Sequence, residues 1–385
     1  MKIIFSNPYL SLPSRSAEAV FLMKMAESYG KLGHDLTLFL LDNGNSLNLK
    51  ELCEHFAVEE VFRIEGFKLS NQSKVLFFQL AFMIPYNYYL KKPDLFHAKH
   101  ITPAWGAVRF FGISTVLELH DTPTKNRKTF MLFKNLVKSK SLRFLICITH
   151  ALANHVRQFV PDNLNILVIP DGVNRAALEF DLSKEKAKSQ LGINTNKPIV
   201  LYTGQLYKGR GIGLIIELAK RLSDFYFVLV GGNPNDIIKF KECAVLLSNI
   251  SFEGFKSQSE LLIYQKSANF LLMPYADKVS VSGDKGGDTA QFASPMKMFE
   301  YMATGRPIIS STLPVLSEIL EDDYNALMVP YNDVDGWVKA LELLKNNPAI
   351  GERLANQAKD DVKQYTWEKR AEKIIDFYNS IDEKK

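Results

Sequence analysis

Cysteine is scarce in this chain, and the three residues present form no recognisable pattern. Cys53, Cys147 and Cys243 are odd in number and lie far apart in a sequence of 385 residues. A disulfide framework needs paired cysteines, and a cysteine-based metal site needs closely spaced ones, so neither is expected. We expect reduced thiols in a reducing compartment, and no metal site.

Long apolar runs are also missing. The most apolar window, residues 75–90, includes Gln79, Pro85 and Asn87 and is shorter than the ~20 residues needed to span a bilayer. The first residues form no basic segment followed by an apolar one, so no export signal is expected. With 46% hydrophobic and 23% charged residues, the sequence is typical of an ordinary soluble, cytoplasmic enzyme.

The length and the order of elements predict two domains of the α/β class. A chain of 385 residues is too long for one typical core. Short β-branched or apolar runs, such as residues 2–5 and 35–41, alternate with helical patterns, which favours a parallel sheet covered on both faces. The pattern restarts at residues 198–202 after a polar, turn-rich stretch. We therefore expect two Rossmann-like domains, residues 1–173 and 174–366, and a last helix within 367–385.

The net charge of +5 is concentrated in the N-terminal half. Residues 1–173 contain 20 Lys and Arg against 14 Asp and Glu, and the remainder contains 27 against 28. Residues 125–143 carry no acid, and Phe130, Phe133 and Leu136 are interleaved with their cations. This stretch could lie on an anionic membrane surface if those side chains face outward, or it could be a solvated helix with a core-facing stripe. No nucleic-acid-binding module is recognisable, so nucleic acid is not an expected partner.

The most informative segment is residues 294–310, with the sequence SPMKMFEYMATGRPIIS. Pro295 suits a first helical turn and Gly305 suits a helix end, so the spacing predicts a short helix between them. Lys297 and Glu300 are three residues apart and share one face of it. A cation, a helix N-terminus that favours phosphate and a carboxylate that can accept hydroxyl hydrogen bonds together suggest a nucleotide-sugar site. The alternative is a capped surface helix with an ion pair.

This segment resembles the donor-binding signature of retaining family 4 glycosyltransferases, also described as glycosyl transferases group 1, which have the GT-B fold. The resemblance implies two Rossmann-like domains with parallel sheets facing a central cleft, and a C-terminal helix that crosses back onto the first domain. It also implies that Glu300 binds the ribose hydroxyls and that Ser294 and Pro295 belong to the donor site. The family usually has a second glutamate seven residues earlier, where this chain has Phe292.

Residues 203–212 resemble the family's diphosphate-binding loop. Aligned without gaps, Gly204 and Gly211 match, Arg210 takes the position of the usual lysine and Gln205 takes that of the usual arginine. Glycines in such a turn let the backbone approach phosphate closely. Gly232, in the turn after a later strand, and Phe255 are further expected donor contacts. Each has a structural alternative, a plain turn for Gly232 and a core position for Phe255.

The expected contacts of the first domain follow its strands. Ser14, Arg15 and Ser16 lie in the loop after the first strand, where the family has a phosphate- and acceptor-facing loop; a plain loop with Ser16 as helix cap is the alternative. His120 ends a strand, and the resemblance implies that it touches the donor sugar or the reacting phosphate. His97 and His100 end the preceding strand and are expected on the acceptor side.

The resemblance implies a retaining transferase that moves a sugar from a nucleotide-diphosphate sugar to a hydroxyl of a glycan or lipid-linked acceptor. Such an enzyme would serve cell-surface polysaccharide or glycolipid synthesis at the inner face of the cytoplasmic membrane. His120, Arg210 and Lys297 are the expected catalytic residues, with no cofactor and no metal. Two alternatives remain. A non-catalytic nucleotide-sugar-binding subunit is possible because Phe292 and Gln205 replace usual donor contacts, and a nucleotide-sugar 2-epimerase is possible because it shares the two-domain architecture.

Overall fold

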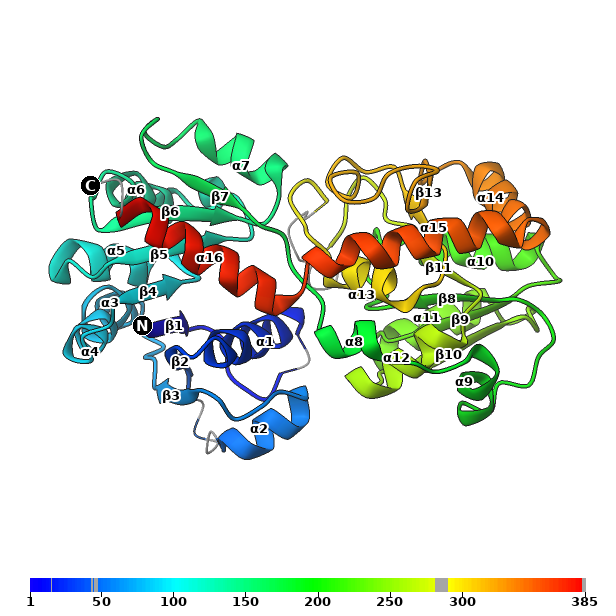
Figure 1. The fold of residues 1–385 in the computed structure, drawn as a ribbon, viewed down its shortest axis with the longest axis horizontal. Coiled ribbons are helices and arrows are strands. Elements are labelled where there is room, and N and C mark those ends of the chain that lie inside the picture. The colour runs from blue at the N-terminus through cyan, green and yellow to red at the C-terminus, as the bar shows by residue number, and fades with distance from the viewer. Residues whose placement is uncertain (15, 43, 45–47, 281–289, 383–385) are drawn as a thin grey trace. The chain divides into compact units, whose positions relative to one another are not determined.

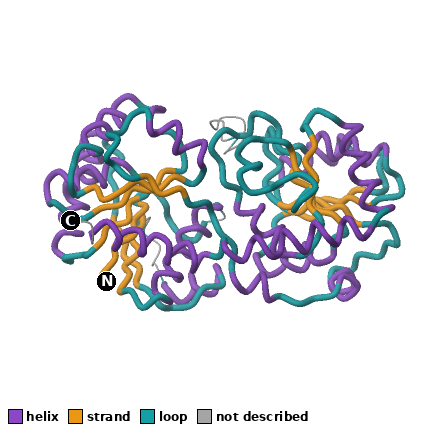
Figure 2. The backbone as a smooth tube through the Cα atoms, turned by 45° about the horizontal axis from the view of Figure 1, so that its top comes forward, coloured by secondary structure: helices purple, strands orange, loops and turns teal. Residues whose placement is uncertain are grey.

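The protein divides into two compact units, described from a computed structural model that covers residues 1–14, 16–42, 44, 48–280 and 290–382. Unit 1 comprises Met1–Asp171 and Trp367–Lys385, and unit 2 comprises Gly172–Thr366 (Figure 1). In each unit the strands gather into one sheet with helices around it (Figure 2). The last helix of the chain, α16 (Trp367–Asp382), is therefore part of unit 1.

Unit 1 is built on a seven-stranded sheet in which all pairings are parallel. In spatial order its strands are β3 (Arg63–Phe67), β2 (Asp35–Leu41), β1 (Lys2–Asn7), β4 (Leu95–Ala98), β5 (Thr115–Leu119), β6 (Leu142–Cys147) and β7 (Ile166–Val168). Every residue of β4 and β5 is buried. Burial on both faces is what continuous apolar runs in a parallel sheet require.

The helices of unit 1 follow its strands. They are α1 (Ala17–Lys31), α2 (Leu49–Phe56), α3 (Ser73–Phe78), the π-helical turn η1 (Gln79–Met83), α4 (Ile84–Leu90), α5 (Ile101–Phe111), the 3-10 turn η2 (Pro123–Lys125), α6 (Arg127–Leu136), α7 (His150–Arg157) and α16. Helix α16 packs beside α1, and α5 packs against α4, η1 and α6. The apolar window 75–90 thus forms short surface helices. No helix in the described part of the chain is long and apolar enough to cross a membrane.

Unit 2 has a six-stranded sheet that is also parallel throughout. In spatial order its strands are β10 (Ile250–Gly254), β9 (Tyr226–Val230), β8 (Ile199–Thr203), β11 (Phe270–Met273), β12 (Ile308–Ser311) and β13 (Leu327–Val329). Its helical segments are α8 (Arg175–Glu179), α9 (Lys184–Gln190), α10 (Ile212–Arg221), α11 (Pro234–Cys243), α12 (Gln258–Ser267), α13 (Met296–Thr304), α14 (Val334–Asn346), α15 (Pro348–Asp361) and the 3-10 turn η3 (Val362–Gln364).

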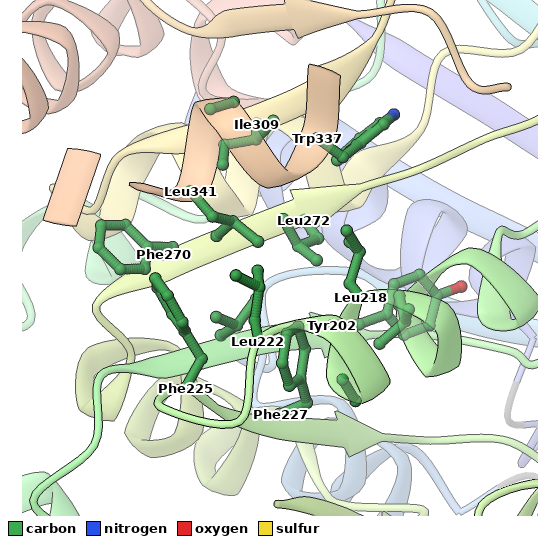
Figure 3. Close-up of a cluster of buried hydrophobic side chains, with 14 of the residues drawn as sticks. Tyr202, Leu218, Leu222, Phe225, Phe227, Phe270, Leu272, Ile309, Trp337 and Leu341 are labelled. Carbon is green, nitrogen blue, oxygen red and sulfur yellow. The ribbon is translucent and has the colours of Figure 1, made fainter. Parts of the chain in front are cut away.

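One face of the unit 2 sheet carries a large apolar core. Side chains of β8, β9, β11 and β12 meet those of α10 and α14 there, including Phe227, Leu272, Leu218 and the fully buried Trp337 (Figure 3). The indole of Trp337 donates its N–H to the Pro330 carbonyl at 3.0 Å, which satisfies its one polar group. This core fixes β8 and β11 side by side, and the loops that follow these two strands form the site described next.

The basic stretch 125–143 forms η2, α6 and the turn into β6. Phe133 and Leu136 are buried, with 0% and 1% exposure, and Phe130 packs edge-on against Phe159 at 5.2 Å. The alternative in which these apolar side chains face outward for membrane insertion is therefore wrong. The stretch is a solvated helix with a core-facing stripe, and its lysines lie on the outer side.

Candidate functional site

In each sheet the direction of the strand order reverses at one strand. Polar side chains gather beyond the ends of the strands at that position. In unit 2, β8 lies between β9 and β11; in unit 1, β1 lies between β2 and β4. Successive connections from such a point leave in opposite directions, so a crevice opens outside the carboxyl ends of the two strands. Ligands of open α/β sheets bind at these crevices.

In unit 2 two cations lie against one tyrosine beyond β8 and β11. The Arg210 Cζ and the Lys297 Nζ are each 4.7 Å from the ring centroid of Tyr275, which follows β11. Lys297 Nζ also lies 3.9 Å from the ring centroid of Tyr202, on β8. A cation over an aromatic face is held by the ring quadrupole and keeps some of its charge available to a ligand. The arrangement therefore concentrates two positive charges, and no residue in the described ranges forms an ion pair with either of them.

Burial and mutual repulsion alter the protonation of these groups. Burial, and then the neighbouring Arg210, lower the pKa of Lys297 to about 8. Burial raises the pKa of the Tyr275 phenol, but Arg210 and Lys297 outweigh burial and hold it below its ordinary value. The lowered pKa of Tyr275 indicates positive potential at the site, because a positive field favours the phenolate, whereas the lowered pKa of Lys297 is mainly the effect of burial. An anion bound there would relieve both.

The third polar group of this cluster is the Glu300 carboxylate. Lys297 and Glu300 lie on α13, which is capped at its N-terminus by Pro295 and at its C-terminus by Gly305 in the left-handed region. Burial raises the pKa of Glu300, and Gln265 of α12 donates a hydrogen bond to its Oε2 at 3.4 Å. No ion pair joins Glu300 to Lys297 among the described residues, so the capped surface helix with an ion pair does not describe this segment.

The loop between β8 and α10 brings its backbone close to Lys297. A Cβ on Gly204, whose φ is +130°, would lie 3.4 Å from Lys297 Nζ. The strands β8 and β9 pair in register up to Thr203 and Val230, which sets Gly231 directly against Gly204. A Cβ on Gly231 would come within 2.3 Å of the Gly204 carbonyl oxygen. Only residues without a side chain allow this approach.

In unit 1 the polar cluster centres on a carboxylate that the solvent does not reach. Glu118 of β5 is 0% exposed and accepts from Nε2 of His97 at 2.9 Å, from Lys99 Nζ at 3.4 Å and from the guanidinium of Arg370 at 3.0 Å. It also contacts Nε2 of His120. Burial opposes ionisation, but Arg370 and Lys99 hold the pKa of Glu118 well below its usual range. Since Arg370 belongs to α16, this network also attaches the C-terminal helix.

His120 stands at the open edge of that network. Its side chain is 32% exposed, and its Nε2 lies between Glu118 and Lys99 Nζ, the latter at 2.5 Å. Burial and then Lys99 lower its pKa to about 4, so the imidazole is neutral at pH 7. A neutral imidazole has one N–H; Nε2 either donates to Glu118 or accepts from Lys99, and Nδ1 takes the complementary role.

His100 follows β4 and joins the end of β1. Its Nε2 donates to the Asn7 Oδ1 at 2.9 Å, while the amide nitrogen of Asn7 donates to Glu18 at 2.7 Å. The ring packs edge-on against Tyr9 at 4.5 Å. Burial and then Lys99 lower the pKa of His100 to about 3, so this imidazole is also neutral. The strand ends β1, β4 and β5 thus carry His100 and His120 at one edge of the sheet.

Comparison with known proteins identifies the family. Residues 183–361 match the family described as "Glycosyl transferases group 1", and residues 19–177 match "Glycosyltransferase Family 4". The chain belongs to the group 1 glycosyl transferases. The GT-B architecture expected from the sequence is confirmed by the fold of HepE from Anabaena. Its structure in complex with UDP has a TM-score of 0.75 and 17% identity, and covers 99% of this chain and 100% of that one; HepE has also been solved with UDP-glucose.

Curated relatives of this glycosyltransferase are distant. An uncharacterised glycosyltransferase of Methanocaldococcus jannaschii is 23% identical over 75% of this chain and 76% of its own length. The UDP-Gal:alpha-D-GlcNAc-diphosphoundecaprenol alpha-1,3-galactosyltransferase of Escherichia coli is 20% identical over 66% of this chain and 65% of its own length. For a second M. jannaschii glycosyltransferase, the match spans about half of its length, 53%.

Several predicted donor contacts of this glycosyltransferase lie near the cation pair, and others do not. Gly232, with a φ of +79°, packs against Leu206 of the Gly204 loop. Ser294 is buried just before α13. The Gln205 backbone carbonyl accepts the Tyr202 hydroxyl at 2.8 Å. Phe255 follows β10, two strands from β8, and is 48% exposed, so it is not a core residue.

Two residues of the predicted phosphate loop of unit 1, Ser14 and Ser16, form hydrogen bonds at the start of α1. Ser16 caps α1 by accepting from the Ala19 N–H at 3.2 Å, and Ser14 donates to the Ser16 hydroxyl at 3.1 Å. This is the helix cap that the sequence left open as the alternative for Ser16. Arg15 lies outside the described residues.

Four residues of these clusters were missed by sequence reasoning. The rings of Tyr202 and Tyr275 lie against Lys297 Nζ. Glu118 and Arg370 form a buried ion pair, and Glu118 also contacts His120. Tyr275 follows a strand at its carboxyl end, a signal that could have identified it. Arg370 offered no such signal, because its partner Glu118 lies 252 positions earlier in the chain.

Proposed function

We propose that this glycosyltransferase is a retaining enzyme that uses a nucleotide-diphosphate sugar as donor and a hydroxyl group as acceptor. The observation that carries the proposal is the pair of cations, Arg210 and Lys297, on the Tyr275 ring at the strand-order reversal of unit 2. The N-terminus of α13, from which Lys297 projects, adds backbone N–H groups and a partial positive charge. A diphosphate is the ligand whose charge matches this site.

The diphosphate is the leaving group of the proposed reaction. The acceptor hydroxyl oxygen forms a bond to the anomeric carbon of the sugar, and the bond from that carbon to the diphosphate oxygen breaks with its electron pair staying on the phosphate. The hydroxyl proton passes to the departing phosphate oxygen. Negative charge grows on the diphosphate during this step, so Arg210 and Lys297 stabilise the transition state more than the ground state. In this proposal they do so without a metal ion.

Glu300 is assigned to the ribose of the donor. The half-buried Glu300 carboxylate can accept two hydroxyl hydrogen bonds, because within the described part of the chain its one side-chain donor is Gln265, at a long 3.4 Å. The usual second carboxylate is replaced by Phe292, so we infer that the sugar hydroxyls of the donor are bound by other groups. Gly204 and Gly232 leave room for the donor because they carry no side chain.

His120 is assigned to the donor sugar or the reacting phosphate, and His100 to the acceptor side. Their neutral rings can donate or accept one hydrogen bond each at pH 7, but they do not add positive charge. Glu118 and Lys99 both contact His120 Nε2, and so fix the orientation of the ring for this contact.

We propose that the acceptor is a glycan or a lipid-linked sugar of cell-surface polysaccharide or glycolipid synthesis. The E. coli relative named above acts, by its name, on a diphosphoundecaprenol-linked sugar, and this supports an acceptor at a membrane. A cytoplasmic enzyme working at the inner face of the cytoplasmic membrane would meet both such an acceptor and nucleotide sugars.

The proposal is tested by screening nucleotide sugars for thermal stabilisation and then incubating the stabilising donor with and without candidate acceptors. A ligand at about a hundred times its dissociation constant adds roughly 2.7 kcal/mol of stability. Acceptor-dependent release of nucleoside diphosphate, with an anomeric linkage in the product equal to that of the donor by proton NMR, is the expected result. Conversion of the donor alone would indicate a 2-epimerase. Nucleotide binding with no transfer would indicate a non-catalytic subunit, and an inverted linkage would contradict the retaining assignment.

A further inference from the structure

An exposed aromatic surface lies on unit 1, on the helices that follow β3 and β4. It is formed by α3, η1, α4 and α5, which pack against one another beside β4 (Figure 1). We name it the aromatic face and define it by its six exposed rings: Phe77, Phe78, Phe82, Tyr86, Tyr89 and Phe110. Their exposed fractions range from 38% for Phe82 to 53% for Phe78.

The rings of the aromatic face form one continuous cluster. Phe78, Phe82 and Tyr86 repeat every four residues and stack in turn, at 5.5 Å and 6.5 Å between centroids. Phe82 meets Phe110 of α5 at 5.6 Å, and Tyr89 joins through Phe111 at 5.6 Å. Rings that pack on each other while remaining half exposed form a patch, and a patch of this kind on a soluble unit marks an interaction surface.

The surroundings of the aromatic face are cationic. The segments α3, η1, α4, α5 and α6 contain no Asp or Glu. Lys74 lies one turn before Phe78 and is exposed, and Lys92 follows α4 and is also exposed. Residues 66–117 hold six Lys and Arg and a single acid, Asp94. An apolar patch alone fits a partner of either charge, but the Lys and Arg residues around this patch favour an anionic partner.

Beside the aromatic face, a groove of about 260 Å³ runs between α5 and α6. Arg109 lines it from α5 and Lys138 from the turn after α6. Trp105 and Asn135 also line it, and the Trp105 indole N–H donates to the Asn135 amide oxygen at 2.8 Å. Trp105 also contacts Phe77 and Phe110, at 6.4 Å and 5.3 Å. A phosphate bound between the two cations would therefore lie next to apolar rings.

We propose that the aromatic face and this groove dock unit 1 on an anionic phospholipid bilayer. Phenylalanine and tyrosine rings enter the boundary between headgroups and acyl chains, and Arg109 and Lys138 bind a lipid phosphate in the groove. The exposed lysines along α6 add long-range attraction. The proposal deepens the membrane acceptor suggested under the proposed function, but it rests on surface chemistry and does not require the protein to be a transferase.

The test is sedimentation of the full chain with vesicles of phosphatidylcholine alone and of a three-to-one mixture with phosphatidylglycerol, at low and high salt. We expect binding to the mixed vesicles that weakens with salt. The F78S/Y89S variant should bind at least roughly tenfold less at all salt concentrations. The R109A/K138A variant should lose roughly fivefold for each cation at low salt and less at high salt. The V245S/L246S variant is the matched control, because these exposed apolar residues lie in unit 2 and should not affect binding.

A spectroscopic measurement locates the docked surface. Trp337 and Trp367 are buried, with 0% and 3% exposure, whereas Trp105 lies at the groove. Phospholipids brominated on their acyl chains should therefore quench a fraction of the fluorescence that disappears in the W105F variant. Equal quenching in W105F, no binding to mixed vesicles, or equal binding by F78S/Y89S would overturn the proposal. A concentration-dependent dimer abolished by F78S/Y89S would also overturn it, in favour of self-association. All variants should retain the unfolding temperature and nucleotide binding of the parent, which separates this proposal from the donor site.

Discussion

Binding of a nucleoside diphosphate to unit 2 should take up a proton at alkaline pH, and Lys297 is the group expected to receive it. Its pKa in the free site is lowered from 10.5 to about 8 by burial and by Arg210. A bound diphosphate supplies the missing anion and should return the pKa to its ordinary value or above. Tyr275 should act in the same direction, because an anion beside its phenol would raise its lowered pKa.

The magnitude follows from the fraction of Lys297 that is neutral before binding. A group with a pKa of about 8 is roughly one-tenth deprotonated at pH 7 and roughly nine-tenths at pH 9. We therefore expect an uptake of about 0.1 proton per diphosphate at pH 7 and about 0.9 at pH 9, with an affinity about tenfold weaker at pH 9.

Isothermal titration calorimetry with UDP, in two buffers of different ionisation enthalpy, measures the uptake directly. The Lys297→Arg variant keeps the charge without titrating in this range, so it should bind with little proton uptake at pH 9. The Lys297→Met variant should bind roughly ten- to a hundredfold more weakly. Its unfolding temperature without ligand should be equal or higher, because a buried charge is removed. Lys339→Met, an exposed lysine of α14, is the matched control. Equal proton uptake by the parent and Lys297→Arg at pH 9 would refute the reasoning.

Three further predictions concern other groups of the two sites. Glu300→Gln should weaken donor binding by about 1.5–3 kcal/mol with the unfolding temperature unchanged, measured by calorimetry; unchanged donor binding and turnover would remove the ribose assignment. Arg210→Ala should lower kcat at saturating donor by about a hundredfold or more, since one transition-state donor is lost; unchanged turnover would contradict this role. Arg370→Met should lower the free energy of unfolding by about 3–5 kcal/mol, because Glu118 would stay buried and lose its guanidinium partner. A loss below 1 kcal/mol in urea titrations would show that Lys99 alone is sufficient to stabilise the Glu118 carboxylate.

Acid should destabilise unit 1 through histidines whose pKa is lowered in the folded state. Burial lowers the pKa of His120 to about 4, so the unfolded chain binds protons more tightly than the folded one between pH 4 and the ordinary pKa of 6.5. The free energy of unfolding should therefore rise with pH across that window and level off above it. Glu118, with its lowered pKa, adds a loss in the same direction at more acidic pH. Urea titrations from pH 4 to 8 measure the slope, and His120→Asn should reduce it; a slope that is unchanged in this variant would contradict the account.

The fold followed from the sequence because its signals are local. Apolar runs such as residues 35–41 and 198–202 became β2 and β8 nearly residue for residue, and Gly305 ended α13 as its conformational freedom requires. The unit 2 cations could also be predicted. Lys297 lies at a helix start three residues before Glu300, and Arg210 was assigned through the resemblance of residues 203–212 to the family's diphosphate-binding loop. Their common neighbour Tyr275 was missed, because a tyrosine after a strand has no motif of its own and only its position at the carboxyl end of β11 could have indicated it.

Contacts between distant segments could not be predicted in the same way. The pairing of Glu118 with Arg370 depends on α16 folding back onto unit 1, and no pattern within either segment records it. The orientation of α6 is a similar case. Its alternation of cations with Phe133 and Leu136 fits an outward or an inward apolar face equally well, and only the packing of the surrounding helices decides that the stripe is buried.

Transfer from a nucleotide sugar is the central claim, and it is tested most directly by following the release of nucleoside diphosphate from the stabilising donor. The account predicts release that depends on an added lipid-linked or glycan acceptor, appears in equal amount with the glycosylated product, and is reduced at least roughly tenfold in Lys297→Met but not in Lys339→Met. Release that is equal in the parent and Lys297→Met, or product formed without stoichiometric nucleoside diphosphate, would contradict it.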